Sequence, residues 1–337
     1  MDMDVEEMQF LGFFGFFKES FKLLVRHARL MARFALILVL PLSFALLGHT
    51  LVTDPLLNRI RLNEEMLAVE RSEGHSAAVV HTRRELYSEL GRLGTLLLAY
   101  LVFVLAFSLL STAAVVYSVA CIYVDKSVTV AKVLGVVPRV WKRLMVTFLW
   151  VFLIMFAYHV TFIVSVGLLL VALGSVPALL LPLLLLLALA FFALQVYLNV
   201  IWHLASVITV LEEHYGIAAL KKSARVVKGK RMVGSCLVFT HMVASGIIAA
   251  LFHARVVSAN SRLPSAGPRL SLAALLVALL TLVNLLGMLL QSLFYFSVKS
   301  FHHESIDRMV LSDHLDAYLG EYVPLKDPDI QMEVMEP

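Results

Sequence analysis

Charge is scarce in this sequence. Only 15% of the 337 residues are Asp, Glu, Lys or Arg, whereas 60% are hydrophobic, and the mean hydropathy is +0.88. Soluble domains carry about 25% charged residues. A chain with so little charge and so much apolar surface is not a soluble globular protein.

Cysteine is nearly absent as well. Cys121 and Cys236 are the only two, and both lie in or beside apolar runs. We expect them to be small buried side chains rather than a disulfide or a zinc site. The sequence has no N-x-S/T sequon, and its acidic start, MDMDVEEMQF, is unlike the positive start of a cleaved signal peptide.

The sequence also lacks catalytic motifs. It contains no G-x-S-x-G, H-E-x-x-H, phosphate-binding P-loop or C-x-x-C. The stretch HHESID places His303 and Asp307 one helical turn apart, but a metal site needs three or four converging ligands. We therefore expect no enzyme activity, no cofactor and no metal, and interpret this stretch as a solvated helix beside the membrane.

Long uncharged runs dominate what is present. Crossing the hydrocarbon core takes about 20 apolar residues. The run Leu144–Leu211 is too long for one span, and the breaker cluster GSVPALLLP favours two spans over three. The chain is thus predicted to be all-α, an integral membrane bundle of six helices in a single membrane domain. The predicted spans cover about 32–53, 94–122, 144–172, 178–210, 232–254 and 272–298.

Positive charge is distributed unevenly around these spans. Nineteen of the 28 Lys and Arg residues fall before the first span, after the last, or in the loops 125–143 and 212–231. Basic residues near span ends are retained in the cytosol. Both termini are therefore predicted to be cytosolic; the sequence does not indicate which membrane.

The loop YGIAALKKSARVVKGKRM holds the densest positive charge. Ile217, Leu220, Ala224 and Val227 recur at helical spacing between its basic residues, as in an amphipathic helix at a membrane surface. Its candidate contacts with anionic lipid are Lys221, Lys222, Arg225, Lys228, Lys230 and Arg231.

Similar units occur twice more. Residues 10–31 place Phe10, Phe14, Phe17, Phe21 and Leu24 along one side, and residues 127–145 form a weaker unit, with Ser127 as a helix N-cap. Each unit ends in basic residues and precedes a hairpin of two spans. This pattern predicts three degenerate repeats of an interfacial helix plus a transmembrane hairpin, although any loop beside a membrane shares some of these features.

Two stretches carry a family resemblance. The segment AALKKSARVVKGKRM is similar to the membrane domain found beside bacterial glycerophosphodiester phosphodiesterases. The segments IWHLASVITVLEEHYGIAALKKS and FHHESIDRMVLSDHLDAYLGEYVPLKD resemble a family of uncharacterised plant multispanning membrane proteins. This resemblance implies a fold with six spans. It does not imply any particular activity for this protein.

Uncharged polar residues occur deep in the predicted spans, where no Asp, Glu, Lys or Arg is found. The candidates are His159, Gln195, Asn199, His203, His241, Asn284 and Gln291. They could line a polar pathway or simply form interhelical hydrogen bonds.

Two charged segments complete the chain. Residues 54–92 are predicted to be an outer loop with two short helices around Gly74, and residues 301–337 an acidic cytosolic tail with nine Asp and Glu against Arg308 and Lys326. The tail is either a solubilising segment or a neighbour of the basic loops that modulates their contact with lipid.

These features lead to three hypotheses. The favoured one is a non-enzymatic scaffold, trafficking or membrane-organising component, whose partners are the bilayer and its anionic lipids and not nucleic acid. The alternative is a transporter or channel for an uncharged or weakly charged solute. The third is an enzyme that uses the His-rich cluster HHESID after the last span.

Overall fold

A computed structural model describes residues 10–73, 76–124, 126, 129–174, 176–258 and 266–302. Ser127, His303, Asp307 and nearly all of the expected acidic tail lie outside these residues. Within them the chain is helical and has no strand, which confirms the all-α fold.

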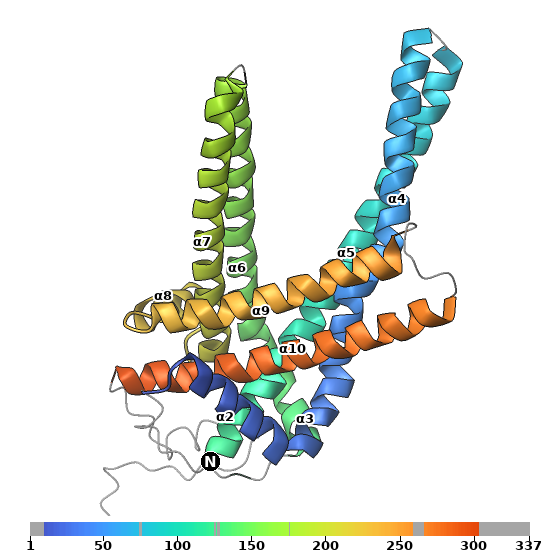
Figure 1. The fold of residues 1–337 in the computed structure, drawn as a ribbon. Helices are drawn as coiled ribbons and strands as arrows, with labels where there is room; N and C mark the ends of the chain where they lie inside the picture. The colour runs from blue at the N-terminus through green and yellow to red at the C-terminus, as the bar shows by residue number, and fades with distance from the viewer. Residues whose placement is uncertain are drawn as a thin grey trace, which may run out of the picture.

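The helices follow one another with short connections (Figure 1). In order they are α2 (Phe13–Arg26), α3 (Ala28–Phe34), the π-helical turn η1 (Ala35–Val39), α4 (Leu40–Glu73), α5 (Ser76–Tyr123), α6 (Val130–Leu173), α7 (Pro177–Leu211), α8 (Ile217–Val226), α9 (Arg231–Phe252), the π-helical turn η2 (His253–Val257) and α10 (Ala266–Phe301).

Six helical segments of the described chain are long and apolar enough to cross a membrane. They are Ala28–Ser72, Val79–Tyr123, Val140–Leu173, Ala178–Leu211, Arg231–Val257 and Gly267–Phe301. The long run from Leu144 to Leu211 does form two helices, which meet at the predicted breaker cluster, although Pro182 lies inside α7 without ending it. The chain has the architecture of an integral membrane protein with a six-helix bundle.

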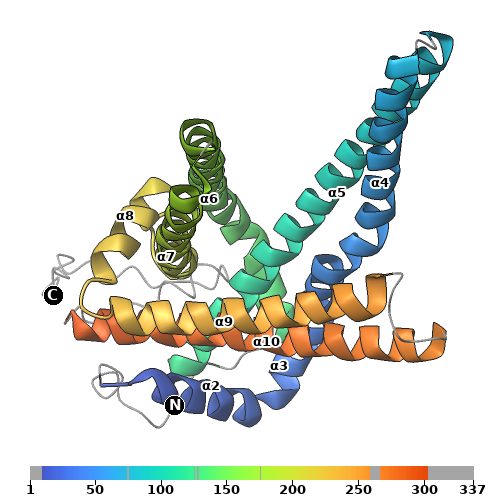
Figure 2. The same cartoon turned by 45° about the horizontal axis from the view of Figure 1, so that its top comes forward.

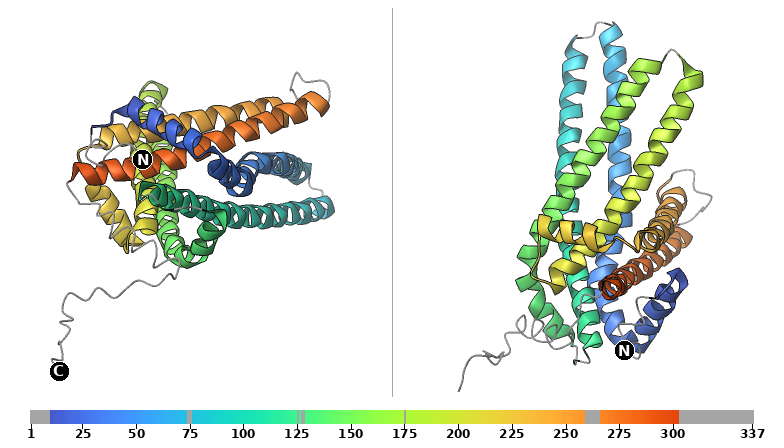
Figure 3. Two further views of the ribbon diagram at one scale, coloured as in Figure 1. Left: turned by 90° about the horizontal axis from the view of Figure 1, so that it is seen from below. Right: turned by 90° about the vertical axis from the view of Figure 1, so that its left-hand side faces the viewer.

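The long helices form three hairpins, α4–α5, α6–α7 and α9–α10 (Figures 1 and 2). The hairpins diverge from a common base, so that their tips point in different directions (Figure 3). The short helices α2, α3 and α8 all lie at this base. We call it the basic end: α2, α8 and the adjoining helix termini at Tyr123, Leu211, Arg231 and Phe301.

Packing is dense at the basic end and sparse at the tips. The larger core joins α2, α5, α6, α7, α8 and α10, with Phe16, Tyr123, Leu144, Ile208 and Phe296 fully buried. A smaller core joins α4 to α9 and α10. The outer halves of α6 and α7 instead expose apolar side chains such as Val171 and Leu181, a surface suited to lipid rather than water.

Residues 54–92 are helical on both sides of residues 74–75, as predicted, but these helices are not separate short elements of a loop. The spans continue as helices to Glu73 on one side and from Ser76 on the other, with Ile60 and Leu67 buried seven residues apart. Seven-residue spacing is typical of helices packed side by side, and Thr82 Oγ1 donates a hydrogen bond of 3.1 Å to Glu70 Oε1 across the pair. Charged residues end a membrane span, but these good helix formers do not end a helix.

The prediction of a separate interfacial helix at residues 127–145 is wrong. Residues 130–145 are the start of α6 itself, with Thr129 as the N-cap accepting a hydrogen bond from the Lys132 amide. Val136 and Val140 are buried on either side of Pro138, and this packing keeps the helix continuous through the proline. Separate helices precede the first and third hairpins only.

The two cysteines differ in solvent exposure. Cys121 is buried as expected, whereas Cys236 is exposed on α9.

Candidate functional site at the basic end

Helix α8 is held against α7 by its smallest residues. Ala219, Ser223 and Val226 form its buried face, and Ser223 Oγ donates a hydrogen bond of 2.7 Å to the Ile201 carbonyl. Small residues let helices approach closely. The opposite face of α8 is therefore free to present its basic side chains.

The structure separates the six basic candidates into two groups. Lys221, Arg225, Lys228 and Arg231 are exposed, whereas Lys222 and Lys230 point inward. The guanidinium of Arg231 lies 5.9 Å from the ring centre of Tyr197. Four of the six therefore lie at the surface, and two make contacts inside the protein.

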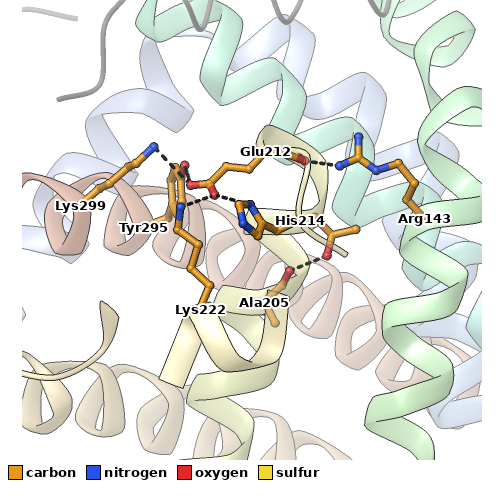
Figure 4. A network of polar contacts seen from close by, with 8 residues as sticks. Arg143, Ala205, Glu212, His214, Lys222, Tyr295 and Lys299 are labelled. Carbon is orange, nitrogen blue, oxygen red and sulfur yellow. Dashed lines mark hydrogen bonds and ion pairs between the residues drawn. The ribbon is translucent and has the colours of Figure 1, made fainter. Parts of the chain in front are cut away.

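Lys222 belongs to a cluster of charges around Glu212, the residue directly after α7 (Figure 4). Lys222 Nζ lies 2.7 Å from Glu212 Oε2, and Lys299 Nζ of α10 lies 3.2 Å from Oε1. The Tyr295 hydroxyl donates to Oε1 at 2.8 Å, and His214 Nδ1 lies 3.6 Å from Oε2. One carboxylate thus joins α7, α8 and α10.

The electrostatics of Glu212 reflect two opposing effects. Burial raises the pKa of its carboxyl, but the hydrogen bond from Lys222, the charge of Lys299 and the hydrogen bond from Tyr295 outweigh burial. The pKa of Glu212 therefore lies below its ordinary value, and the side chain is ionised at neutral pH.

Helix α6 joins the same cluster through the backbone. The Arg143 guanidinium donates a hydrogen bond to the Glu212 carbonyl (Figure 4). It also lies 5.7 Å from the ring centre of Tyr215. One turn later, Thr147 Oγ1 lies 3.0 Å from Thr209 Oγ1 and accepts from the Gly216 amide at 2.8 Å. These contacts fix the path of the chain from α7 into α8.

Gly216 is required in this turn. Its φ of +61° is a conformation that side chains disfavour, and an added Cβ would lie 3.3 Å from Val146 and 3.4 Å from Trp150. Tyr215 and Gly216, the first two residues of the basic loop YGIAALKKSARVVKGKRM, thus form the tight turn into α8.

The turn that follows α8 is fixed by the end of α10. Lys230 Nζ donates a hydrogen bond of 2.6 Å to Ser297 Oγ, near the rings of Phe16 and Phe301, and its burial lowers its pKa. His302 Nε2 lies 2.8 Å and 2.9 Å from the carbonyls of Val226 and Lys228. Nε2 therefore carries a proton and caps the end of α8.

Helix α2 lies beside α10 at the same end. Phe16, Ser20 and Leu23 are buried, and the ring centres of Phe16 and Phe294 are 5.9 Å apart. Phe10, Phe14 and Phe21 are exposed, the first two above 80%. We call these three the phenylalanine face.

The predicted apolar side of α2 is thus only partly outward, since Phe17 and Leu24 pack against the core. The charged residues Lys18, Lys22, Arg26 and Arg29 are exposed alongside the phenylalanine face. Helix α2 therefore exposes both apolar and basic side chains.

Three of the polar candidates within the spans come together. The ring centres of His203 of α7 and His241 of α9 are 6.4 Å apart, and Gln291 of α10 lies beside them. They line a cavity of about 30 Å³. That volume holds one or two waters but no larger solute.

The other candidates make separate contacts. Gln195 donates to Asn199 at 3.5 Å, Asn199 to Met242 Sδ at 3.2 Å, and Asn284 to Ser43 of α4 at 3.0 Å. His159 lies apart, bonded at 2.7 Å to the Met155 carbonyl of its own helix.

Sequence reasoning missed the residues that organise the site: Arg143, Glu212, Tyr295 and Lys299. A usable signal was present, because Arg143 and Glu212 directly flank the long uncharged run. An acid at the end of such a run, among basic loops, indicates an internal ion pair.

Comparison with known proteins adds a family but no activity. No curated protein and no solved structure matches the chain, so the similarity to the membrane domain beside the phosphodiesterases stays a prediction. Residues 1–335 match the family described as a domain of unknown function, DUF8558. Since the match spans nearly the whole chain, this protein belongs to the DUF8558 family of uncharacterised proteins.

Proposed function

We propose that this protein is a membrane-organising scaffold that binds anionic lipid headgroups through α8. Both termini and the basic end face the cytosol in this proposal, in keeping with the retention of basic loops on that side. The phenylalanine face of α2 rests in the adjoining interfacial layer, where aromatic side chains are favoured.

The observation that carries the proposal is the arrangement of charge on α8. Lys221, Arg225 and Lys228 are exposed side by side, next to Arg231 at the start of a span. Meanwhile Lys222 is used internally to clamp the helix through Glu212. A cationic surface that is rigidly held at a membrane-spanning helix supports binding to anionic lipid.

A transporter is less well supported. The polar residues that converge within the spans border a cavity of about 30 Å³, which suits water and interhelical packing. The remaining candidates bond within or between helices in pairs.

The test compares two matched triple variants in nanodiscs. The first is Lys221→Gln, Arg225→Gln and Lys228→Gln on α8. The control is Arg59→Gln, Arg83→Gln and Arg84→Gln in the distal part of the α4–α5 hairpin, where all three arginines are also exposed. Both remove three positive charges, but only the first alters the basic end.

The measurement is the enrichment of fluorescent phosphatidylserine around the full-length protein, followed by energy transfer. Each basic residue near an anionic surface contributes about 1 kcal/mol, so the α8 variant should lose enrichment by an order of magnitude or more. The control variant should match the wild type. Equal enrichment in all three proteins would refute the proposal.

A further inference from the structure

A second cavity lies far from the basic end, where the third hairpin meets the first. It lies between α4 and the turn η2, which continues α9. Its volume is about 620 Å³, within the range of small-molecule sites, about 300–1,000 Å³. This site is independent of the lipid contacts proposed for α8.

Both helices depart from regular α-geometry at this cavity. Pro55 lies inside α4 and lines the cavity, and its missing N–H leaves the Leu51 carbonyl without its usual donor. Across from it, residues His253–Val257 form a π-helical turn. Single π-helical turns occur frequently at functional sites.

The polar wall follows one face of α4. Asp54, Asn58 and Arg61 are spaced at i, i+4 and i+7, which places them in a row along the helix. Asp54 Oδ2 lies 2.8 Å from His253 Nε2, so its charge is directed to the imidazole. Among the described residues, no carboxylate forms an ion pair with Arg61, and its guanidinium remains available for an anion.

Apolar side chains line the same cavity. Leu51, Leu57 and Val257 line it together with the polar residues, and Leu57 directly precedes Asn58. Leu51 belongs to the uncharged run of its span, whereas Arg61 is ten residues further along α4. The cavity therefore has an apolar residue at the end nearer the uncharged run and a cationic residue at the other end.

We propose that this cavity binds an amphipathic anion. Its carboxylate or phosphate pairs with Arg61 and accepts a hydrogen bond from Asn58, while its hydrocarbon part contacts Leu51, Leu57 and Val257. A single-chain lipid with an anionic headgroup has this chemistry.

The test uses two photoreactive probes of one chain length, a fatty acid and the corresponding alkyl phosphate, with full-length protein in phosphatidylcholine nanodiscs. Crosslinked peptides should map to residues 51–61 or 253–258. Oleate should compete with the fatty-acid probe and lysophosphatidic acid with the phosphate probe, and whichever probe labels the site identifies the headgroup. Uncharged oleyl alcohol should not compete with either.

The matched variants are Arg61→Gln and Arg59→Gln, which remove the same charge two residues apart on α4. Only Arg61 lines this cavity; Arg59 lines a different groove, between α4 and α5. Arg61→Gln should weaken binding roughly tenfold or more, because a charge-assisted hydrogen bond is lost, and Arg59→Gln should leave binding unchanged.

Three results would overturn the proposal. They are labelling by both probes outside the cavity, equal competition by oleyl alcohol, and equal effects of the two variants. Thermal unfolding of both variants, measured in parallel, confirms that any lost binding does not reflect lost fold.

Discussion

The side chain of Glu212 neutralises two lysines that lie between helices. Replacing it with Gln leaves Lys222 and Lys299 close together without their carboxylate. Breaking a fully buried pair costs about 3–5 kcal/mol, and we expect about 2–3 kcal/mol here, because each lysine keeps about a fifth of its side chain exposed. Thermal unfolding in detergent measures the loss, and Glu213→Gln, at an exposed neighbour, should be nearly silent.

The same carboxylate predicts how stability depends on pH. Because the folded pKa of Glu212 is lowered, its contribution is complete above the unfolded value of 4.5 and is lost as the pH falls through the lower folded value. The wild-type protein should therefore lose its advantage over Glu212→Gln as the pH falls below about 4.5. A constant difference between the two down to pH 3 would contradict this assignment.

At the residue scale, sequence reasoning predicted composition better than partners. It identified the basic residues of the 212–231 loop, but their division into exposed and internal side chains depends on Glu212 and Ser297, which lie on other helices. It placed His203, His241 and Gln291 at membrane depth, whereas their meeting depends on how α7 crosses α9 and α10. His159 faces its own backbone, which spacing alone does not reveal.

At the scale of elements, close approach of α9 and α10 depends on a glycine. A Cβ added at Gly287 would lie 2.8 Å from His241 Nδ1, closer than such atoms approach. We expect Gly287→Ala to displace the His241 ring and destabilise the protein by about 1–3 kcal/mol. Thermal unfolding of the purified protein measures the effect.

Gly246→Ala is the control for this change. Gly246 likewise lies inside a helix, α9, but a Cβ added there meets no atom within 4 Å. Alanine should be neutral or slightly stabilising at that position. If both variants unfold at the same temperature, the helices do not pack as closely as described.

The sequence predicted helices well where the length of an apolar run determines the number of spans. It predicted them poorly where charged residues were interpreted as the end of a helix. The breaker cluster correctly placed the turn between α6 and α7. The helical continuation of α4 and α5 past their apolar parts, and of α6 through Pro138, arose from packing between helices that the sequence pattern of one segment does not show.

On the scale of the whole molecule, α10 connects the other parts. Asn284 bonds to α4, Lys299 to Glu212 and Ser297 to Lys230, and Gln291 lines a cavity with His203 of α7. The three hairpins thus share one helix as their common support, whereas the α6–α7 hairpin exposes apolar side chains along its outer half.

The proposed topology has a direct test. A glycosylation sequon inserted between Glu73 and Ser76 should be modified during synthesis into microsomes, because the proposed topology places the hairpin tip in the lumen. A sequon inserted after Glu213 should remain unmodified, since the same topology places that position in the cytosol. The reverse pattern would invert the orientation and remove the basic end from the cytosolic leaflet.

The length of the first hairpin sets a distance. At about 1.5 Å per residue the 48 residues of α5 extend about 72 Å, whereas the hydrocarbon core is about 30 Å thick. Most of the excess lies in the paired helical tip around Glu73 and Ser76, on the side away from α2 and α8. We therefore expect this tip to project beyond the hydrocarbon core and to be the first part of the protein that a surface approaching that face of the bilayer meets.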